Sequence, residues 1–318
     1  MIKKITYAAA ILLVIQVGLT LFLNTRPTGL EVGQPDSFFS RFSQGDVTSL
    51  TITDDDGNKL ALARKNSDWF IDRDYPVPVD NTMVNTLLEK LAKARTGLAV
   101  ATSSGSARRF ATADDDFNRH VIVKKQQDVA ADFYLGTSAG LRQSHVRKSG
   151  EKAVFTIAIS DFEMSTAEDD WIDKNLVKID GHQLTEIGVR KIVLKKTDAI
   201  WEQTEPETAA LDQDKVGELV DTVTGFTVRH IFNPAEVSSL FAGATAEHIA
   251  ITLDNGNKLT YSLVKKDDSY VLKTSDSDLY FEVPPWQVEP LVELDPEQLK
   301  ATAKSKDSGA EPVASSGT

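Results

Sequence analysis

The sequence contains no cysteine among its 318 residues. This absence excludes disulfide bonds, a thiol nucleophile, cysteine-ligated zinc and a lipid-modified cysteine anchor. It does not fix the redox compartment, because a chain of this length buries enough apolar surface to fold without covalent cross-links. The length is sufficient for two domains.

Basic charge is scarce, with 35 Lys and Arg against 47 Asp and Glu and a net charge of −12. Nucleic-acid binding depends on basic groups that neutralise phosphates, so the balance argues against a nucleic-acid partner. It also argues against adsorption on an anionic lipid surface. Acidity of this size is typical of a well-solvated protein surface.

Nucleotide and metal motifs are missing as well. The sequence has neither a G-x-x-x-x-G-K-[ST] loop nor a G-x-G-x-x-G loop. Its histidines are scattered and never form the H-E-x-x-H spacing that places two imidazoles on one helix face for zinc. We therefore expect no cofactor and no metal site. The histidines are His120, His145, His182, His230 and His248.

Two short stretches superficially match motifs that carry chemistry. Gly136–Gly140 fits the G-x-S-x-G nucleophile elbow around Ser138, which requires a strand before it and a helix after it. The residues that follow favour another strand, so a hairpin loop is the better prediction and a Ser138 hydrolase is the lesser alternative. Asp54–Gly57 and the run Asp114–Asp116 lack the Gly and Glu positions of a calcium loop and predict solvated turns. We expect no enzymatic activity.

The longest hydrophobic run lies at the N-terminus, from Ile5 to Leu23. As a helix it spans about 28 Å, close to the roughly 30 Å hydrocarbon core of a bilayer. Lysines precede it, so the positive-inside rule leaves residues 1–24 as a cytoplasmic tip and inner-membrane anchor, with the rest periplasmic or extracellular. The anchor residues of this prediction are Lys3, Lys4, Ile5, Leu12, Leu13 and Leu23.

Two alternatives to an uncleaved anchor stay open. A cleaved signal peptide needs small residues in an Ala-x-Ala-like pattern, which Leu23-Asn24-Thr25 does not provide. A buried core helix is disfavoured because the run has no amphipathic pattern and stands at the N-terminus.

An internal repeat organises the exported region. The stretch Leu60–Leu91 predicts a strand, a strand centred on tryptophan, a proline-marked turn and a capped amphipathic helix, and Ile192–Val223 repeats it. Trp69 and Trp201 lie 132 residues apart. The same offset joins Leu62 to Leu194, Asp80 to Asp212, Val84 to Val216, Leu87 to Leu219, and Leu88 to Val220.

The wider pattern predicts an α+β fold with a transmembrane helix followed by a duplicated, mostly antiparallel sheet-plus-helix unit. We expect a linker at 25–46 with a short helix at Asp36–Phe42, repeats at 47–180 and 181–298, and a disordered tail at 299–318. The second repeat, beginning near Val189, is expected to lack the first hairpin strand. Each repeat is expected to end in a tryptophan-bearing helix, Ala167–Leu176 with Trp171 and a piece after Pro284 with Trp286.

The tryptophans admit two interpretations. Trp69 and Trp201 recur at equivalent strand positions, which is typical of core packing rather than of sugar-stacking aromatics. Asp170, Trp171 and Asp173 form a less ordinary acidic cluster, which we predict as an interaction surface. Acidic residues at a helix start also favour its dipole, so a structural role is the competing explanation.

These residues resemble a known family. The N-terminal anchor, the tryptophan strand with its proline turn, the capped helix and four later segments are similar to a domain-of-unknown-function family encoded beside ABC transporters of the gliding-motility type. The resemblance covers Val47 to about Leu294. The four later segments are Asp114–His120, Tyr134–Gly140, Val154–Ile157 and Asp170–Leu176.

The resemblance implies an envelope-anchored accessory or scaffold protein beside an ABC permease and its auxiliary subunit, and it carries over no catalytic residue. The expected partners are the lipid bilayer and one of those subunits. The alternative is a periplasmic module that binds a peptide or glycan in a groove between the two repeats.

Overall fold

The computed structural model describes residues 16, 37–39, 43–103, 105–206, 210–243 and 246–301. The predicted anchor Ile5–Leu23, with Lys3, Lys4, Leu12 and Leu13, lies outside these ranges except for Gln16. Within them, no helix is long and apolar enough to span a membrane. The last 17 residues of the predicted tail, 302–318, also lie outside.

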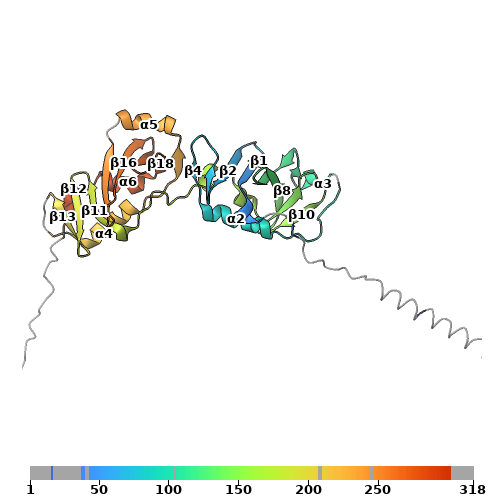
Figure 1. Cartoon of the computed structure of the whole chain (residues 1–318), viewed down its shortest axis with the longest axis horizontal. Coiled ribbons are helices and arrows are strands. Elements are labelled where there is room, and N and C mark those ends of the chain that lie inside the picture. Colours follow the sequence, from blue (N-terminus) through green and yellow to red (C-terminus); the bar gives the residue numbers. More distant parts are fainter. Residues whose placement is uncertain are drawn as a thin grey trace, which may run out of the picture. The chain divides into compact units, whose positions relative to one another are not determined.

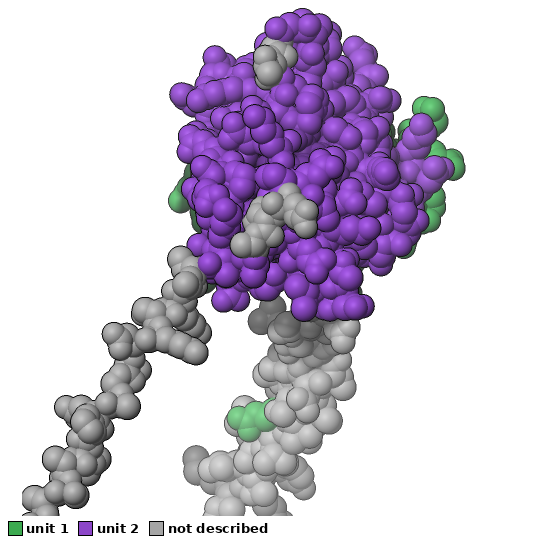
Figure 2. Space-filling model, turned by 90° about the vertical axis from the view of Figure 1, so that its left-hand side faces the viewer, with its two compact units in different colours: residues 1–64, 85–166 green, residues 65–84, 167–318 purple. Residues whose placement is uncertain are grey.

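The chain forms two mostly antiparallel sheets with a few helices, an α+β fold (Figure 1). Its compact units, coloured separately in Figure 2, are Met1–Arg64 with Asn85–Thr166 and Lys65–Val84 with Ala167–Thr318. The two sequence repeats do not coincide with these units, because Lys65–Val84 of the first repeat is grouped with Ala167–Thr318.

The first sheet has eight strands in the order β10-β9-β8-β7-β1-β2-β3-β4. Alternate residues of β1 are buried, with Leu50 and Ile52 at 0% exposure, which is the two-residue period of a half-buried strand. The strands are β1 (Ser49–Asp54), β2 (Lys59–Lys65), β3 (Asp68–Ile71), β4 (Val77–Pro78), β7 (Arg119–Lys125), β8 (Asp128–Gly140), β9 (Gln143–Lys148) and β10 (Val154–Ile157). A separate pair is β5 (Thr112–Ala113) with β6 (Asp116–Phe117).

The second sheet also has eight strands, in the order β13-β12-β11-β15-β16-β17-β18-β14. Its strands are β11 (Leu184–Val189), β12 (Ile192–Thr197), β13 (Ile200–Glu205), β14 (His230–Phe232), β15 (Glu247–Leu253), β16 (Lys258–Lys266), β17 (Ser269–Thr274) and β18 (Tyr280–Val283). The helices of both repeats are α2 (Asn81–Lys93), α3 (Ser106–Arg109), α4 (Gln213–Thr224), α5 (Pro234–Gly243) and α6 (Pro285–Val292). Short 3₁₀ turns are η1 (Gln44–Asp46), η2 (Asp161–Met164), η3 (Glu168–Asp170), η4 (Gly181–Gln183) and η5 (Pro296–Leu299).

The strand orders support the internal repeat. The series β3-β2-β1-β7-β8-β9-β10 of the first sheet matches β13-β12-β11-β15-β16-β17-β18 of the second. Each sheet then has one extra strand, β4 beyond β3 in the first and β14 beyond β18 in the second. Duplication of a single unit produces this arrangement, in which seven strands share one order and a capped helix follows the tryptophan strand of each repeat, β3 or β13.

Hydrogen bonds repeat with the same 132-residue offset. The backbone N–H of Trp69 donates to Asn81 Oδ1 at 2.8 Å, and that of Trp201 donates to Gln213 Oε1 at 3.0 Å. Asp80 caps α2 through the N–H of Thr82 at 2.8 Å, as Asp212 caps α4 through the N–H of Asp214 at 3.2 Å. These bonds fix the tryptophan strand against the start of its helix.

Each repeat closes with a later segment that returns to the cap residue. The N–H of Asp80 donates to the carbonyl of Trp171 at 2.8 Å, and that of Asp212 donates to the carbonyl of Leu299 at 2.9 Å. Both Trp171 and Leu299 are buried. The structural equivalent of Trp171 is therefore Leu299, and the predicted match between Trp171 and Trp286 was wrong.

Four further predictions need correction. The second repeat has the first hairpin strand as β11. The sequence pattern did not indicate it because the turn between β11 and β12 is shorter than the turn between β1 and β2. Ala167–Leu176 contains only the turn η3, since the chain must bring Trp171 back to Asp80. At Asp36–Phe42, Ser37 bridges Arg95 instead of starting a helix. The tail cannot start at 299, because Leu299 is buried and Lys300 bridges Leu211.

Candidate interaction surface

Each repeat exposes one large aromatic side chain just after its β-meander. Phe162, the second residue of η2 after β10, is 87% exposed. Trp286, the second residue of α6 after β18, is 68% exposed. The two aromatics occupy equivalent places in the repeat, although their neighbours differ.

The local backbone explains why both aromatics point outward. Two residues after each of them lies a fully buried side chain, Met164 after Phe162 and Val288 after Trp286. Since a helical turn rotates about 100° per residue, burying the later position turns the aromatic toward solvent. Glu163, in the capping box of η2, also pairs with Lys90 of α2.

Glu163 holds the turn that carries Phe162 in place through its bonds to Lys90 and to Ser160. Burial of the Glu163 carboxyl opposes ionisation, but hydrogen bonds from Lys90 and from Ser160 outweigh burial, and its pKa lies below the ordinary value. The carboxylate therefore stays ionised, so η2 holds Phe162 at the surface.

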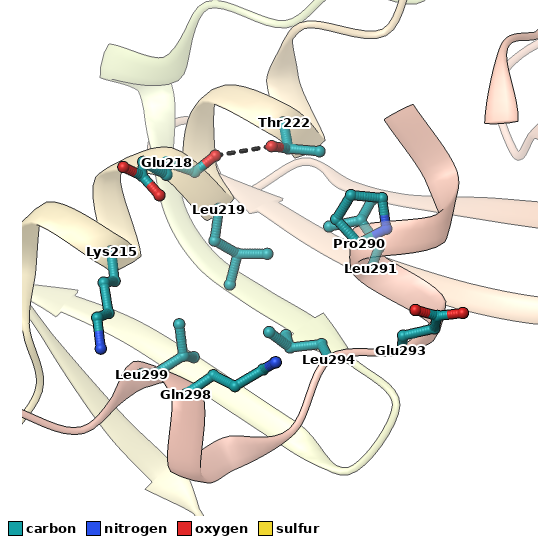
Figure 3. Close-up of a pocket in the computed structure, with 10 residues that line it drawn as sticks. All are labelled: Lys215, Glu218, Leu219, Thr222, Pro290, Leu291, Glu293, Leu294, Gln298 and Leu299. Atoms are coloured by element: carbon teal, nitrogen blue, oxygen red, sulfur yellow. Dashed lines mark hydrogen bonds between the residues drawn. The ribbon is translucent and has the colours of Figure 1, made fainter. Parts of the chain in front are cut away.

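In the second repeat the corresponding region is a hollow between α4 and α6 (Figure 3). We call this hollow of ≈ 470 Å³ the α4–α6 groove. Leu219 of α4 and Leu294 and Leu299 from the chain after α6 point toward one another in it. Leu291 and Pro290 of α6 complete its apolar lining.

The rim of the α4–α6 groove is acidic. Glu218 of α4 and Glu293, which directly follows α6, line it, and Glu289 stands on the exposed face of α6 one turn before Glu293. In the described part of the chain, none of these three carboxylates forms an ion pair. Lys215 is the one cation among the described lining residues.

The predicted interaction surface at Asp170, Trp171 and Asp173 is divided by the structure. Trp171 is fully buried and offers no area to a partner, whereas Asp170 is exposed and Asp173 is half-buried. Asp173 Oδ1 accepts from the N–H of Asn175 at 2.9 Å. A role for the two aspartates in contacting a partner stays a prediction.

The segment that follows Trp171 is a structural junction within its compact unit. The carbonyl of Lys174 accepts from the N–H of Val228 at 3.1 Å, and the carbonyl of Val177 accepts from the buried Tyr261 hydroxyl at 2.8 Å. Burial raises the pKa of that hydroxyl far above its ordinary value. Backbone carbonyls of this segment thus join Asp80 to the second repeat.

Ser138 lies in a β-hairpin. Strand β8 continues through Gly140, and β9 begins at Gln143, so no helix follows the serine. Ser138 Oγ donates to the carbonyl of Gly140 at 3.1 Å. Gly136 is required for another reason, since a Cβ there would lie 1.8 Å from the carbonyl oxygen of Phe110. The strand–turn–helix context of a nucleophile elbow is absent here.

The two repeat tryptophans are core residues. Trp69 is 0% exposed and Trp201 is 7% exposed, which removes both as sugar-stacking aromatics. The ligand-binding alternative for the groove between the repeats therefore loses its candidate side chains. No structural observation favours that alternative.

The acidic runs are held by protein partners. Asp54 Oδ2 accepts from Thr166 Oγ1 at 2.7 Å, although Asp54 starts the turn that superficially matches a calcium loop. Asp114 Oδ1 accepts from the buried Arg147 Nη2 at 2.6 Å, and this bond is the main reason that the pKa of Asp114 lies below its ordinary value. Across the residues that the structure describes, no cluster of three metal-ligating side chains occurs.

A family model matches residues 69–240, more than half of the chain, and the chain belongs to that family, described as Domain of unknown function (DUF4340). No curated protein and no solved structure matches the sequence. The predicted membership of a domain-of-unknown-function family is thereby confirmed.

Sequence reasoning missed Phe162 and assigned Trp286 to the wrong equivalence. A signal exists in both places: an aromatic at the second position of a helical turn, two residues before an apolar side chain. The groove has no signal in the local sequence. It is lined by residues 215–222 and 290–299, which only the fold brings together.

Proposed function

We propose that this protein is a non-enzymatic accessory or scaffold component of an ABC-type transporter complex in the cell envelope. The apolar run Ile5–Leu23 would hold it in the inner membrane, with the duplicated region on the periplasmic or extracellular side. The family resemblance supports the transporter association, and the positive residues before the run support the orientation.

One structural observation carries the interaction role: the equivalent exposure of Phe162 and Trp286. Each aromatic leaves a large apolar area in water, which costs about 25 cal/mol per Å² relative to burial. A single exposed apolar residue is ordinary, but the same position exposed in both repeats indicates two surfaces for partners. Aromatic side chains are also enriched among the residues that dominate binding energy at interfaces.

The test is recovery of partners from native membranes with the tagged full-length chain in mild detergent. We expect an ABC permease or auxiliary subunit to copurify with the wild type. Changing both Phe162→Ser and Trp286→Ser should weaken the complex by at least about thirtyfold and reduce recovery accordingly, because loss of one interface aromatic costs about 2 kcal/mol. Leu141→Ser is the matched control, since Leu141 is 92% exposed at the β8–β9 hairpin tip.

Copurification of no ABC subunit with the wild type would overturn the proposal. Full recovery with the double variant would show that the aromatics are not the contact surface.

A further inference from the structure

We propose that the α4–α6 groove binds one amphipathic, basic α-helix of a partner protein. This inference rests on the proposed scaffold function, for which it names the docking surface and the chemistry of the partner. The groove belongs entirely to the second repeat.

The floor of the groove fits apolar side chains. Leu219 and Leu299 are almost fully buried, whereas Leu294 is only half-buried and faces the open hollow. Pro290 is exposed at its edge, and Trp286 stands one helical turn before Pro290 on the same face of α6. The apolar surface thus continues out of the groove onto α6, which a helix with several apolar residues along one face would cover.

The walls of the groove favour a helix over an extended peptide. An added strand needs free backbone N–H and C=O groups along a sheet edge. Both walls of this groove belong to helices, which offer no sheet edge to which an extended peptide could add. Apolar positions at i, i+3, i+4 and i+7 of a partner helix insert between such walls without requiring backbone partners.

The charges of the rim select a basic partner. Glu218 lines one wall and Glu293 the other, both are exposed, and within the described residues neither forms an ion pair. Lys or Arg residues flanking the apolar stripe of the partner would meet a carboxylate on either side. An acidic helix would face two repulsions, from Glu218 and Glu293, against one favourable contact at Lys215.

Site-specific photo-crosslinking in native membranes tests this inference. The probe is a benzophenone-bearing phenylalanine in place of Gln298, which lines the groove and is exposed. The same group in place of Asp268, an exposed residue in the β16–β17 turn, is the position control. We expect the groove probe to capture a segment with apolar residues at helical spacing flanked by Lys or Arg, and the control probe to miss it.

The charge requirement is tested in the same format. Glu218→Lys combined with Glu293→Lys should lower the crosslink yield about tenfold, and changing the captured basic residues to Glu should restore it. Restoration excludes misfolding as the cause of the loss. Asp268→Lys should leave the yield unchanged. Capture of an acidic or strand-forming segment, capture of lipid alone, or equal capture at both positions would overturn the inference.

The outcome separates this inference from the proposed function. Copurification of an ABC subunit without capture in the groove would end the docking proposal and keep the scaffold role. Capture of a basic helix from an unrelated protein would keep the groove and end the transporter assignment.

Discussion

The two repeats share their core and differ at the surface between their capped helix and the turn after the last meander strand. In the first repeat, Lys90 of α2 pairs with Glu163 of η2 and ties the helix to the turn. At the same 132-residue offset, the second repeat has Thr222 in place of Lys90. When the repeats are aligned on the exposed aromatics, the residue after Phe162 is Glu163 and the residue after Trp286 is Gln287, whose side chain bonds Thr227 and Gly225 instead. The second repeat has a groove where the first has an ion pair.

The difference teaches that packing was retained after duplication while one surface diverged. The retained features are the tryptophan strand, the aspartate cap and the return of a later segment to the residue before the helix. The divergent feature gives the second repeat a docking surface of its own. The predictions that follow test whether the shared core is energetically equivalent in the two repeats.

The largest expected effect is on the tryptophans. Trp69→Ala should cost about 3–5 kcal/mol, because it removes a fully buried aromatic and leaves a cavity. Trp201→Ala should cost less, since Trp201 is partly exposed and lies on β13 at the end of its sheet. Hydrogen exchange resolved for α2 and for α4 measures the loss in each repeat separately.

Trp286→Ala is the control, with an expected change within about 0.5 kcal/mol because the side chain is exposed. A larger loss for Trp201→Ala than for Trp69→Ala would break the proposed ranking of the two cores.

Asp54 provides the second test, which concerns acid stability of the first repeat. Burial of its carboxyl opposes ionisation, but hydrogen bonds from Thr166 and Asn58 outweigh burial and hold the pKa of Asp54 below its ordinary 3.8. A lowered folded-state pKa stabilises the fold above the unfolded-state pKa, and that contribution is lost as pH falls through the folded value. Asp54→Asn should therefore cost about 1–3 kcal/mol at neutral pH.

The gap between Asp54→Asn and the wild type should begin to narrow near pH 3.8, where the carboxyl of the unfolded chain becomes protonated, and should close as pH falls through the lower folded-state pKa. Urea unfolding at neutral and acidic pH measures this gap. Asp56→Asn, an exposed neighbour in the same turn, should change little at either pH. A gap that is independent of pH would show that the charge of Asp54 does not contribute.

Local signals explain why the sequence could predict the repeat. The tryptophan, the cap and the apolar stripe of each helix lie within about 20 residues of each other, and each depends on short-range chemistry. Of the predicted stripe, Met83 is half-buried, and the other four residues are buried: Val84, Leu87, Leu88 and Leu91.

The remaining features depend on contacts that no local pattern encodes. The offset between repeats is 132 residues at Trp69 but 128 at Trp171, because the intervening loops differ in length. The order of elements, with a tryptophan-bearing segment after each meander, paired Trp171 with Trp286, although Trp286 lies only 115 residues further on. The exposure of Phe162 and Trp286 is also a property of the assembled fold, since it depends on what the neighbouring elements leave uncovered.

The smallest expected effect is on the helix caps. Asp80→Ala and Asp212→Ala should each cost about 1 kcal/mol, the usual value for losing an aspartate cap. The second bond of Asp80, to the N–H of Met83, is 3.1 Å, whereas that of Asp212 to the N–H of Lys215 is 3.5 Å. We expect Asp80→Ala to cost more, seen as faster hydrogen exchange in the first turn of α2 than of α4.

Asp80→Asn and Asp212→Asn keep an acceptor and serve as controls with smaller losses. Equal losses in the two alanine variants would mean that the difference in bond length has no energetic weight, and the two repeats would then be equivalent at their caps.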